Sequence, residues 1–239
     1  MPEMSNDYFQ FRQFIVHQNR CAMKVGTDGT LLGAWAAAPS GRIRILDIGT
    51  GTGLIALMMA QRFPEAEVTG IDIDKDAVIQ AQDNVNSSPF SERIRILRQD
   101  VMKMNDRVMF DSIVSNPPYF VDSLACPDDH RTTARHAISL TYEGLMSQAF
   151  RLLKDDGCFS LIIPTESRSS IESAASIEGF FQTRVCMIKT TPKKQPKRLL
   201  IEFKKHPVKE QDIMTGIIEE SPNVRSEWYQ QLTKEFYIK

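Results

Sequence analysis

The sequence has no surplus of either charge. It carries 29 lysine and arginine residues against 30 aspartate and glutamate residues, which gives a formal net charge of -1 at pH 7 over 239 residues. The global count therefore gives no indication of a nucleic-acid partner, because proteins that bind nucleic acid usually carry a basic face. Any basic surface must be local, and the distribution of lysines and arginines matters more than their sum.

Paired cysteines and metal-ligand spacings are also missing. The sequence contains four widely separated cysteines and no C-x-x-C pair, which argues against a disulfide framework and against a structural zinc site. The histidines lack the spacing of metal ligands as well, so we expect no metal. The four cysteines are Cys21, Cys126, Cys158 and Cys186.

Long hydrophobic runs are absent too. The longest apolar runs, such as residues 31–38, are far shorter than the roughly 20 residues needed to span a bilayer. No signal peptide precedes the polar stretch at residues 5–7. We therefore expect a cytoplasmic protein with no membrane partner, and nothing in the sequence indicates an obligate protein partner.

Short apolar, β-branched runs alternate along the chain with longer helical patterns. Runs that are apolar throughout are typical of strands buried on both faces. The alternation predicts an α/β fold with a mostly parallel sheet and helices on both faces. No helix separates the last two strands, which predicts a hairpin and one antiparallel strand. We expect strands at residues 43–48, 68–73, 94–97, 110–114, 158–163, 185–188 and 199–203, and helices at 30–38, 54–62, 76–86, 142–153, 166–178 and 226–235.

The chain has the length of one α/β domain with small extensions. Residues 41–205 form the expected core. Residues 1–40 carry several aromatic side chains and a predicted helix, and we expect them to cap the ligand cleft. Residues 206–239 form a polar C-terminal extension that ends in another predicted helix.

Glycine stands at alternate positions directly after the first predicted strand. The loop reads Asp47-Ile48-Gly49-Thr50-Gly51-Thr52-Gly53. Alternate glycines let the backbone turn tightly and approach a ligand closely. Dinucleotide-binding folds use G-x-G-x-x-G, whereas here the third glycine follows after one residue. The acid before the loop would repel a diphosphate but suits a ligand with sulfonium and ammonium groups; a glycine turn without a ligand is the alternative.

Acids follow the next two strands. Asp72, with Ile73 beside it, ends the second strand about 20 residues beyond the glycine loop, the spacing of an acid that binds ribose hydroxyls. Asp74 has an alternative role as the N-cap of the next helix. Asp100 and Val101 follow the third strand, where a carboxylate can accept a hydrogen bond from an adenine amine. The alternative for Asp100 is a solvated loop acid.

The most specific motif follows the fourth predicted strand and reads Ser115-Asn116-Pro117-Pro118-Tyr119-Phe120. Two prolines fix φ and remove two backbone donors, which leaves a rigid turn with outward-facing carbonyls. The Asn116 side-chain oxygen and the Pro117 carbonyl can then both accept from one –NH₂ group. Tyr119 offers a flat face on which a planar substrate can stack. The alternative is a proline-stiffened turn with a buried tyrosine.

This arrangement suits methyl transfer to a conjugated amine. Two acceptors draw the amine toward a pyramidal, nucleophilic state as it attacks the methyl carbon. Because the reaction is an in-line displacement on a charged sulfonium, positioning and electrostatics supply most of the acceleration, and no strong general base is required.

In their order along the chain, these features resemble the class I S-adenosylmethionine-dependent methyltransferases, over about residues 43–203. The resemblance implies a Rossmann-like sheet of seven strands with the last strand antiparallel. It also implies that the loop at residues 47–53 holds the methionine part of S-adenosylmethionine, which leaves as S-adenosylhomocysteine. N-P-P-Y resembles the motif of amino-methyltransferases that act on adenine, guanine or a glutamine amide. All three carry –NH₂ on an sp² carbon, so the motif fixes the group attacked better than the molecule.

Three further segments bear on the substrate. Lys24, Thr27 and Asp28 lie before the first strand, in a segment that resembles the part of these enzymes folding over the methionine end of the cofactor, near the reacting groups. Capping of the following helix by Thr27 or Asp28 is the alternative. Arg131 and Arg135 follow N-P-P-Y and suit phosphate contacts. A basic run without an acid lies between the last two strands and either contacts RNA or is a solvated loop. It contains Lys189, Lys193, Lys194, Lys197 and Arg198.

The chain as a whole resembles the bacterial tRNA1(Val) (adenine-37-N6)-methyltransferase family, whose members modify the adenine next to the anticodon. This resemblance implies that the target base leaves the stack of the anticodon loop and stacks on an aromatic side chain. Tyr119 fits that role, with Phe120 as a second wall. Arg131, Arg135 and the basic run would then hold the anticodon stem and loop.

Other functions remain open at this point. N-P-P-Y allows methylation of a guanine amine in ribosomal RNA, although such enzymes often carry a second domain for which this chain has no room. Enzymes that methylate protein glutamine commonly carry a separate N-terminal helical module. A catalytically silent RNA-binding module is the alternative outside enzymes, and the intact motif residues argue against it.

Overall fold

The structure, a computed structural model, describes residues 7–21, 24–105, 107–117 and 140–238. Its main feature is an eight-stranded sheet with the order β10-β8-β9-β7-β6-β3-β4-β5. These strands are β3 (Arg44–Ile48), β4 (Glu67–Asp72), β5 (Ile94–Arg98), β6 (Phe110–Ser115), β7 (Leu153–Pro164), β8 (Phe181–Lys189), β9 (Arg198–Lys204) and β10 (Asp212–Ile217). Two short ribbons accompany the sheet, β1 (Tyr8–Gln10) with β2 (Ile15–His17) and β11 (Glu219–Ser221) with β12 (Val224–Arg225).

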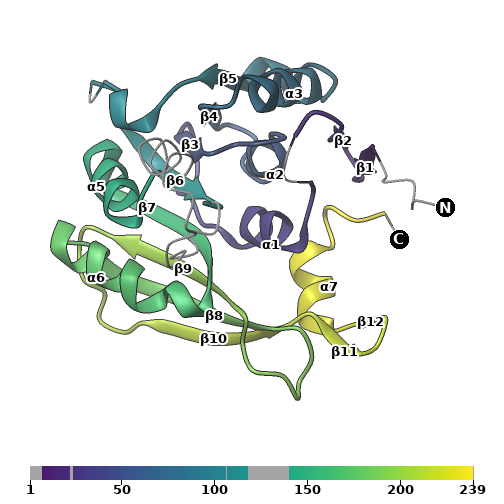
Figure 1. Ribbon diagram of the computed structural model, residues 1–239, viewed down its shortest axis with the longest axis vertical. Helices are drawn as coiled ribbons and strands as arrows, with labels where there is room; N and C mark the ends of the chain where they lie inside the picture. Colours follow the sequence, from purple (N-terminus) through teal and green to yellow (C-terminus); the bar gives the residue numbers. More distant parts are fainter. Residues whose placement is uncertain (1–6, 22–23, 106, 118–139, 239) are drawn as a thin grey trace, which may run out of the picture.

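Helices lie on both faces of the sheet, as the sequence predicts. Figure 1 shows α5 and α6 on one side and α1, α2 and α3 on the other. The α-helices are α1 (Thr27–Trp35), α2 (Leu54–Arg62), α3 (Lys75–Asn86), α5 (Tyr142–Leu152), α6 (Arg168–Glu178) and α7 (Glu227–Thr233). The 3₁₀-helices are η1 (Ser91–Arg93), η2 (Val101–Lys103) and η3 (Thr165–Ser167). No helix in the described part of the chain is both long and apolar enough to cross a bilayer.

Strand directions confirm the class I methyltransferase arrangement. Strands β5, β4, β3, β6 and β7 pair in parallel, and β9 pairs antiparallel with both of its neighbours, β7 and β8. The closing pair is therefore a hairpin that supplies an antiparallel strand, as predicted. The expected count of seven strands is wrong by one, because β10 adds a parallel strand at the edge beside β8. Most of β10 is exposed, so it lacks the apolar run by which the other strands were predicted.

Each face of the sheet buries its own hydrophobic core. On one face, side chains of the sheet pack with α1, α2 and α3 and with both ends of the chain. On the other face they pack with α5 and α6. Helix α1 is buried from Gly29 to Trp35, so its apolar surface runs all round the helix rather than along one stripe. The helix consequently fixes the position of its first turn against the rest of the core.

Several predicted element boundaries are wrong; the strand expected at residues 185–188, for example, spans Phe181–Lys189. The helix expected at residues 30–38 begins at Thr27 and ends at Trp35. The strand expected at residues 158–163 begins earlier, at Leu153, because β7 already pairs with β6 there and absorbs an irregularity in the register. Gly157 is explained by close packing, because a Cβ there would lie 2.7 Å from the Leu153 side chain.

The two ends of the described chain pack together. The ring of Phe11 lies 5.8 Å from that of Tyr237, and the Arg12 amide donates a hydrogen bond to the Phe236 carbonyl at 2.8 Å. The β1–β2 ribbon also packs against α3, where Asn84 bonds to both backbone groups of His17. These contacts place the ribbon on the α2–α3 side of the molecule, and its expected role as a cap over the cleft stays a prediction.

Candidate active site

Asn116 and the glycine loop leave neighbouring strand ends. Ser115, the last residue of β6, is the register partner of Ile48, the last residue of β3, and its hydroxyl donates to the Ile48 carbonyl at 2.9 Å. Gly49 and Asn116 are the next residues of the two strands, so they lie about one strand spacing apart, near 5 Å. Asn116 is half-buried and Pro117 is buried. The fold therefore brings the first part of N-P-P-Y to the predicted cofactor loop.

The predicted acids continue the same row of strand ends. Strands β6, β3, β4 and β5 are adjacent in this order. Asp72 ends β4, and its carboxylate accepts hydrogen bonds from the amides of Gly51 at 3.0 Å and Asp74 at 2.9 Å. Asp74 caps α3, which confirms the alternative role given to it. Asp100 follows β5 and accepts from the Met102 amide at 2.9 Å. The row thus runs from an amide side chain through glycines to two carboxylates.

Two predicted apolar neighbours differ in their exposure. Ile73 follows the acid at the end of β4 and is 50% exposed, whereas Val101 is 4% exposed. An exposed isoleucine beside a strand-end acid offers an apolar surface to a ligand. Val101 packs into the core on the α5–α6 face, so any contribution to a ligand site is through its backbone or through the position of Asp100.

The glycine loop is a turn that only glycine adopts easily. Gly49, Gly51 and Gly53 have φ values of 74°, 54° and 82°, in the left-handed region. The amides of Gly49 and Thr50 donate to the Ile71 carbonyl, and the amide of the next residue, Gly51, donates to the Asp72 carboxylate. A phosphate-binding loop instead presents such amides to its anion. The hydrogen bonding therefore agrees with the sequence argument against a diphosphate.

Asp47 lies beneath the loop and is fully buried. One carboxylate oxygen accepts from the Thr50 hydroxyl at 2.7 Å, and the other accepts no hydrogen bond of normal geometry from the described residues. Burial raises the pKa of Asp47 to about 7, while the hydrogen bond from Thr50 and the Ala56 amide oppose the rise. A cationic group near the unpartnered oxygen would favour the ionised form.

The segment before β3 reaches the same edge of the sheet. Lys24 and Thr27 are exposed, and Thr27 is the first residue of α1. The N-cap is Gly26 and makes no side-chain hydrogen bond, so the alternative that Thr27 or Asp28 caps this helix is wrong. Asp28 instead forms an ion pair with Arg198 at 2.8 Å.

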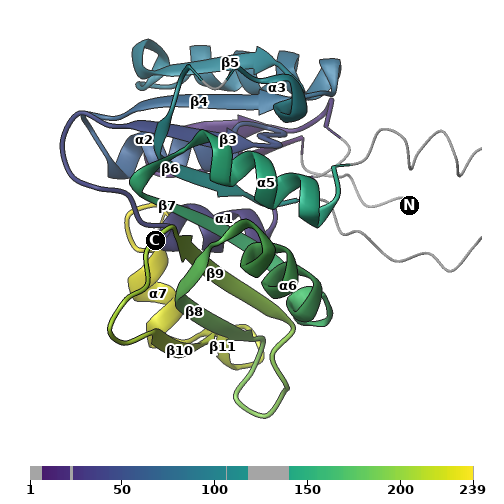
Figure 2. The ribbon, with the colours of Figure 1, turned by 90° about the vertical axis from the view of Figure 1, so that its left-hand side faces the viewer.

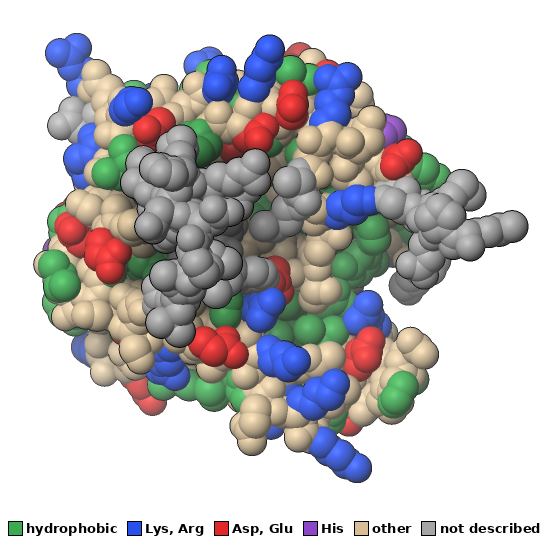
Figure 3. Space-filling view, in the orientation of Figure 1, with side chains coloured by type: hydrophobic (Ala, Val, Ile, Leu, Met, Phe, Trp, Pro, Cys, Tyr) green, Lys and Arg blue, Asp and Glu red, His purple; other side chains and the backbone are tan. Residues whose placement is uncertain are grey.

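The basic run forms the turn between β8 and β9, and hydrogen bonds hold this turn in place. The amide of Thr165, just past the end of β7, donates to the Lys197 carbonyl at 3.2 Å, and the Ile218 amide donates to the Lys189 carbonyl at 2.9 Å. Lys193 and Lys194 are exposed, as is Lys197. Figure 3 shows lysine and arginine side chains gathered on this face, over the region of the β8–β9 turn. The predicted basic surface is thus local and its backbone is pre-organised.

Comparisons with known proteins agree with this geometry. The methyltransferase small domain model matches residues 29–191. A tRNA1(Val) (adenine(37)-N6)-methyltransferase of Phocaeicola vulgatus is 51% identical over 98% of this chain and 99% of its own length. Its counterpart in Bacteroides thetaiotaomicron is 48% identical over 98% of this chain and 99% of its own. The chain belongs to the tRNA1(Val) (adenine(37)-N6)-methyltransferase family. A crystal structure described as a predicted O-methyltransferase from Agrobacterium tumefaciens, 20% identical, superposes with a TM-score of 0.68 over 87% of this chain and 96% of its own, which confirms the class I fold.

The residues present fit S-adenosylmethionine, which methyltransferases of this fold use. A Cβ on Gly49 or Gly51 would meet no atom within 4 Å, so space is open above the loop. The unpartnered oxygen of Asp47 suits a cationic group. Asp72 and Asp100 supply acceptors farther along the row. No phosphate-binding set of amides competes with this interpretation among the described loop residues.

Several predicted residues of the family site lie outside the described residues. They are Tyr119, Phe120, Arg131 and Arg135. Their roles stay predictions.

Sequence reasoning missed the side chains that fasten the site to the N-terminal segment. Asn84 is fully buried on α3 and donates to the carbonyls of Thr52 in the glycine loop, at 2.9 Å, and of His17. Gln80, one turn earlier, accepts from the Arg20 amide at 3.2 Å. The sequence did offer a signal for these contacts, because Gln80 and Asn84 lie four residues apart on a helix face that also carries the apolar residue Ala77.

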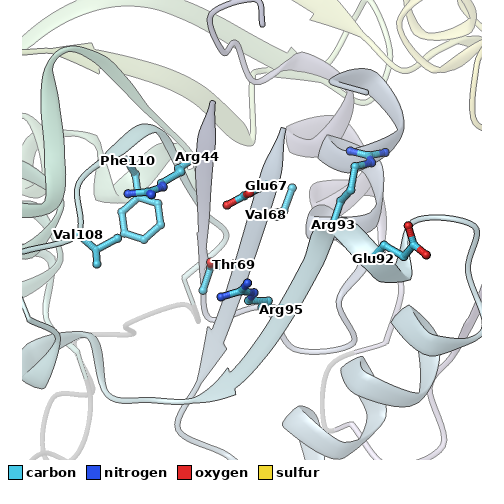
Figure 4. Close-up of a pocket in the computed structure, with 9 residues that line it drawn as sticks. All are labelled: Arg44, Glu67, Val68, Thr69, Glu92, Arg93, Arg95, Val108 and Phe110. Atoms are coloured by element: carbon cyan, nitrogen blue, oxygen red, sulfur yellow. The ribbon is translucent and has the colours of Figure 1, made fainter. Parts of the chain in front are cut away.

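One hollow in the described part of the structure lies away from the site. It has a volume of about 220 Å³ and lies where β3, β4, β5 and β6 begin, at the opposite edge of the sheet from the glycine loop. In Figure 2, α5 and α6 lie over β6, β7 and β9, whereas the helices that contact β4 and β5, α2 and α3, pack on the other face of the sheet. Figure 4 shows the residues around it, which are Arg44, Glu67, Val68, Thr69, Glu92, Arg93, Arg95, Val108 and Phe110. Within the described ranges no group of three or more histidine, cysteine or acidic residues could hold a metal ion.

Proposed function

We propose that this chain transfers a methyl group from S-adenosylmethionine to the exocyclic N6 amine of adenine 37 in tRNA1(Val). The observation that carries the proposal is the position of Asn116 and Pro117 beside the glycine loop. The high identity of the chain to curated tRNA enzymes, over almost its whole length, supports the choice of adenine in tRNA.

The row of strand ends supports an extended cofactor pose. Asp100 would accept from the adenine amine, Asp72 would bind the ribose hydroxyls, and Asp47 with the glycine loop would hold the methionine part. Lys24 and Thr27 would close over the methionine end, with Ile73 and Val101 beside the ribose and adenine. In this order the methyl donor lies at the end of the row that contains Asn116.

Asn116 and Pro117 would bind and activate the target amine. The Asn116 side-chain oxygen and the Pro117 carbonyl accept one hydrogen bond each from the –NH₂ group, which localises the nitrogen lone pair for attack. Tyr119 would stack on the adenine, with Phe120 as a second wall, a contact worth about 1–3 kcal/mol. S-adenosylmethionine would supply an electrophilic methyl group and depart as S-adenosylhomocysteine, and the methylated nitrogen would release one proton to solvent. The mechanism requires no metal, because the sulfonium is already charged.

The β8–β9 turn would hold the RNA backbone. Lys189, Lys193, Lys194 and Lys197 lie in a turn fixed to the end of β7, at the same edge of the sheet as Asn116. Arg131 and Arg135 would add contacts to the anticodon stem and loop, whereas Arg198, at the end of the turn, pairs with Asp28. Phosphate contacts of this kind hold the RNA in register while the unpaired base is extruded, at a cost lower than that of opening a duplex. With such a substrate, we expect the chain to act in the cytoplasm and without an obligate protein partner.

The decisive experiment uses the full chain, labelled S-adenosylmethionine and tRNA transcripts without modifications. Digestion to nucleosides and mass analysis should give N6-methyladenosine from tRNA1(Val), and an A37G transcript should accept no label. Label on guanosine would show that the chain methylates guanine instead. Absence of label from every tRNA, with label on ribosomal RNA or on a glutamine peptide, would overturn the proposal. Cofactor binding without transfer to any substrate would indicate a silent RNA-binding module.

A further inference from the structure

An ion pair joins the first turn of α1 to the start of β9. The Arg198 Nε donates to the Asp28 carboxylate at 2.8 Å, between residues 170 positions apart in the sequence. The two side chains are 29% and 22% exposed. Partial burial reduces solvent screening, so this pair is worth more than a typical surface ion pair.

The arginine end of the pair belongs to the basic turn. Arg198 follows Lys197, and its guanidinium also donates to the Lys197 carbonyl at 3.0 Å. That same carbonyl accepts from the Thr165 amide at the end of β7. Arg198 therefore binds both the last part of the turn and helix α1. The planar guanidinium allows this because it carries several N–H donors in fixed directions.

The aspartate end of the pair belongs to a helix that packs tightly against the cofactor loop. Gly29, next to Asp28, lies so close to Leu54 that an added Cβ would be 3.1 Å from that side chain. Leu54 is the first residue of α2, directly after the glycine loop. A Cβ on Gly33 would lie 2.7 Å from the Met58 sulfur, so the contact between α1 and α2 continues along both helices. Movement of Asp28 would thus move the helix that packs beside the glycine loop.

We propose that Asp28 and Arg198 are positioning residues, which fix the distance between the RNA-holding turn and the cofactor loop. The inference rests on the proposed tRNA methylation. In-line transfer requires the attacking nitrogen and the methyl carbon to approach in one geometry, and a misplacement of about 1 Å can cost about 100-fold in rate. The pair therefore acts on the methyl-transfer step more than on the affinity for either substrate.

The proposal differs from a direct phosphate contact by Arg198. A phosphate contact would depend on Arg198 alone, would weaken tRNA binding when removed, and would reduce its salt dependence. A positioning pair depends on both partners equally. Removing either partner, or both together, should then give the same loss.

The experiment compares Asp28→Asn, Arg198→Gln and the double variant with wild type. The measurements are single-turnover methylation of tRNA1(Val), the Kd of S-adenosylhomocysteine, the Kd of tRNA against salt concentration, and the Tm. Lys154→Gln is the matched control, because Lys154 forms an ion pair of equal length, 2.8 Å, with Asp111 where β6 and β7 begin, at the other edge of the sheet.

We expect each single variant to lower the single-turnover rate about tenfold, and we expect the double variant to lower it no further. Cofactor affinity and the salt dependence of tRNA binding should match wild type, and Lys154→Gln should keep the wild-type rate. If Arg198→Gln lowers the rate but Asp28→Asn does not, and the salt dependence of tRNA binding becomes flatter, then Arg198 contacts a phosphate directly and the proposal is wrong. Unchanged rates in all three variants would overturn it, as would rate losses that only follow Tm. A wild-type protein inactive on tRNA would instead overturn the proposed function on which the inference rests.

Discussion

Asn116 lies where the substrate amine and the methyl donor are proposed to meet, and the structure assigns it no bond in the glycine loop. We therefore expect Asn116→Ala to lower the single-turnover rate by about 100-fold or more, the scale of removing one acceptor or donor aimed at the transition state. The Kd of S-adenosylhomocysteine should stay within about twofold of wild type, since the residue faces the amine. Single-turnover kinetics and calorimetric titration give the two values. Loss of cofactor binding in a folded variant would show that Asn116 supports the cofactor instead.

Asp47 predicts a pH dependence of cofactor affinity. Its pKa of about 7 in the free protein lies above the ordinary aspartate value of 3.8, so the folded state holds the proton more tightly than the unfolded state. Through this group the cofactor-free protein loses stability as pH rises from about 4 to about 7. Binding a cationic ligand requires the ionised form, so affinity should fall below pH 7, by at most about tenfold per pH unit.

Titration calorimetry of S-adenosylhomocysteine from pH 5.5 to 7.5 measures this dependence. Asp47→Asn should bind more weakly at pH 7.5 and show a flat profile, and its Tm without cofactor should exceed that of wild type most clearly at the upper end of the range. A profile of the same slope in Asp47→Asn would assign the titration to another group.

At the scale of elements, one amide side chain on α3 holds two segments that are distant in the sequence. Asn84→Ala would leave the amide and carbonyl of His17 and the carbonyl of Thr52 without their partner. Buried groups left unsatisfied cost about 1–3 kcal/mol each, so partial rehydration gives an expected loss of about 3 kcal/mol. For a chain of this size that corresponds to a fall in Tm of about 6–12 °C. Asn86→Ala, an exposed position on the same helix, should change stability by less than about 0.5 kcal/mol. Equal effects of the two substitutions would exclude the role given to Asn84.

Much of the fold follows from local sequence, because buried parallel strands read as apolar runs and capped helices have recognisable starts. The strand from Arg44 to Ile48 and the helix from Leu54 to Arg62 were predicted within one residue. The strand β10 was not predicted, because an exposed edge strand lacks the continuous apolar run that marks the buried strands. The row of site residues was predicted through the strand ends. The Asp28–Arg198 pair and the contacts of Asn84 were not, since the sequence does not specify which polar side chains meet across the fold.

At the scale of the whole molecule, the protein combines a net charge of -1 with a basic turn, between β8 and β9, that lies beside the site.

We expect Lys193→Ala combined with Lys194→Ala to weaken tRNA binding and to flatten its salt dependence, because fewer counterions are released on binding. The slope of log Kd against log salt should fall by about 0.7–0.9 for each phosphate that the variant no longer neutralises. This slope can be measured by fluorescence anisotropy with labelled tRNA. The salt concentration should range from about 50 to about 200 mM, where phosphate contacts are most sensitive to salt. Lys75→Ala with Lys103→Ala, at exposed positions beside β4 and β5, is the control and should keep the wild-type slope. An unchanged slope in the Lys193→Ala, Lys194→Ala variant would show that the turn does not contact the RNA.

The contacts between the two ends of the chain also order the events of synthesis. Tyr237 is added to the chain 226 residues after its partner Phe11. At about 5–20 residues per second, the interval between them is on the order of tens of seconds. During that time the first aromatic side chains lack part of their final packing, and nascent protein is most exposed to aggregation while such surface stays uncovered. The β1–β2 ribbon therefore reaches its final packing only after Phe236 and Tyr237 have been synthesised, so the order of translation sets the order in which these contacts form.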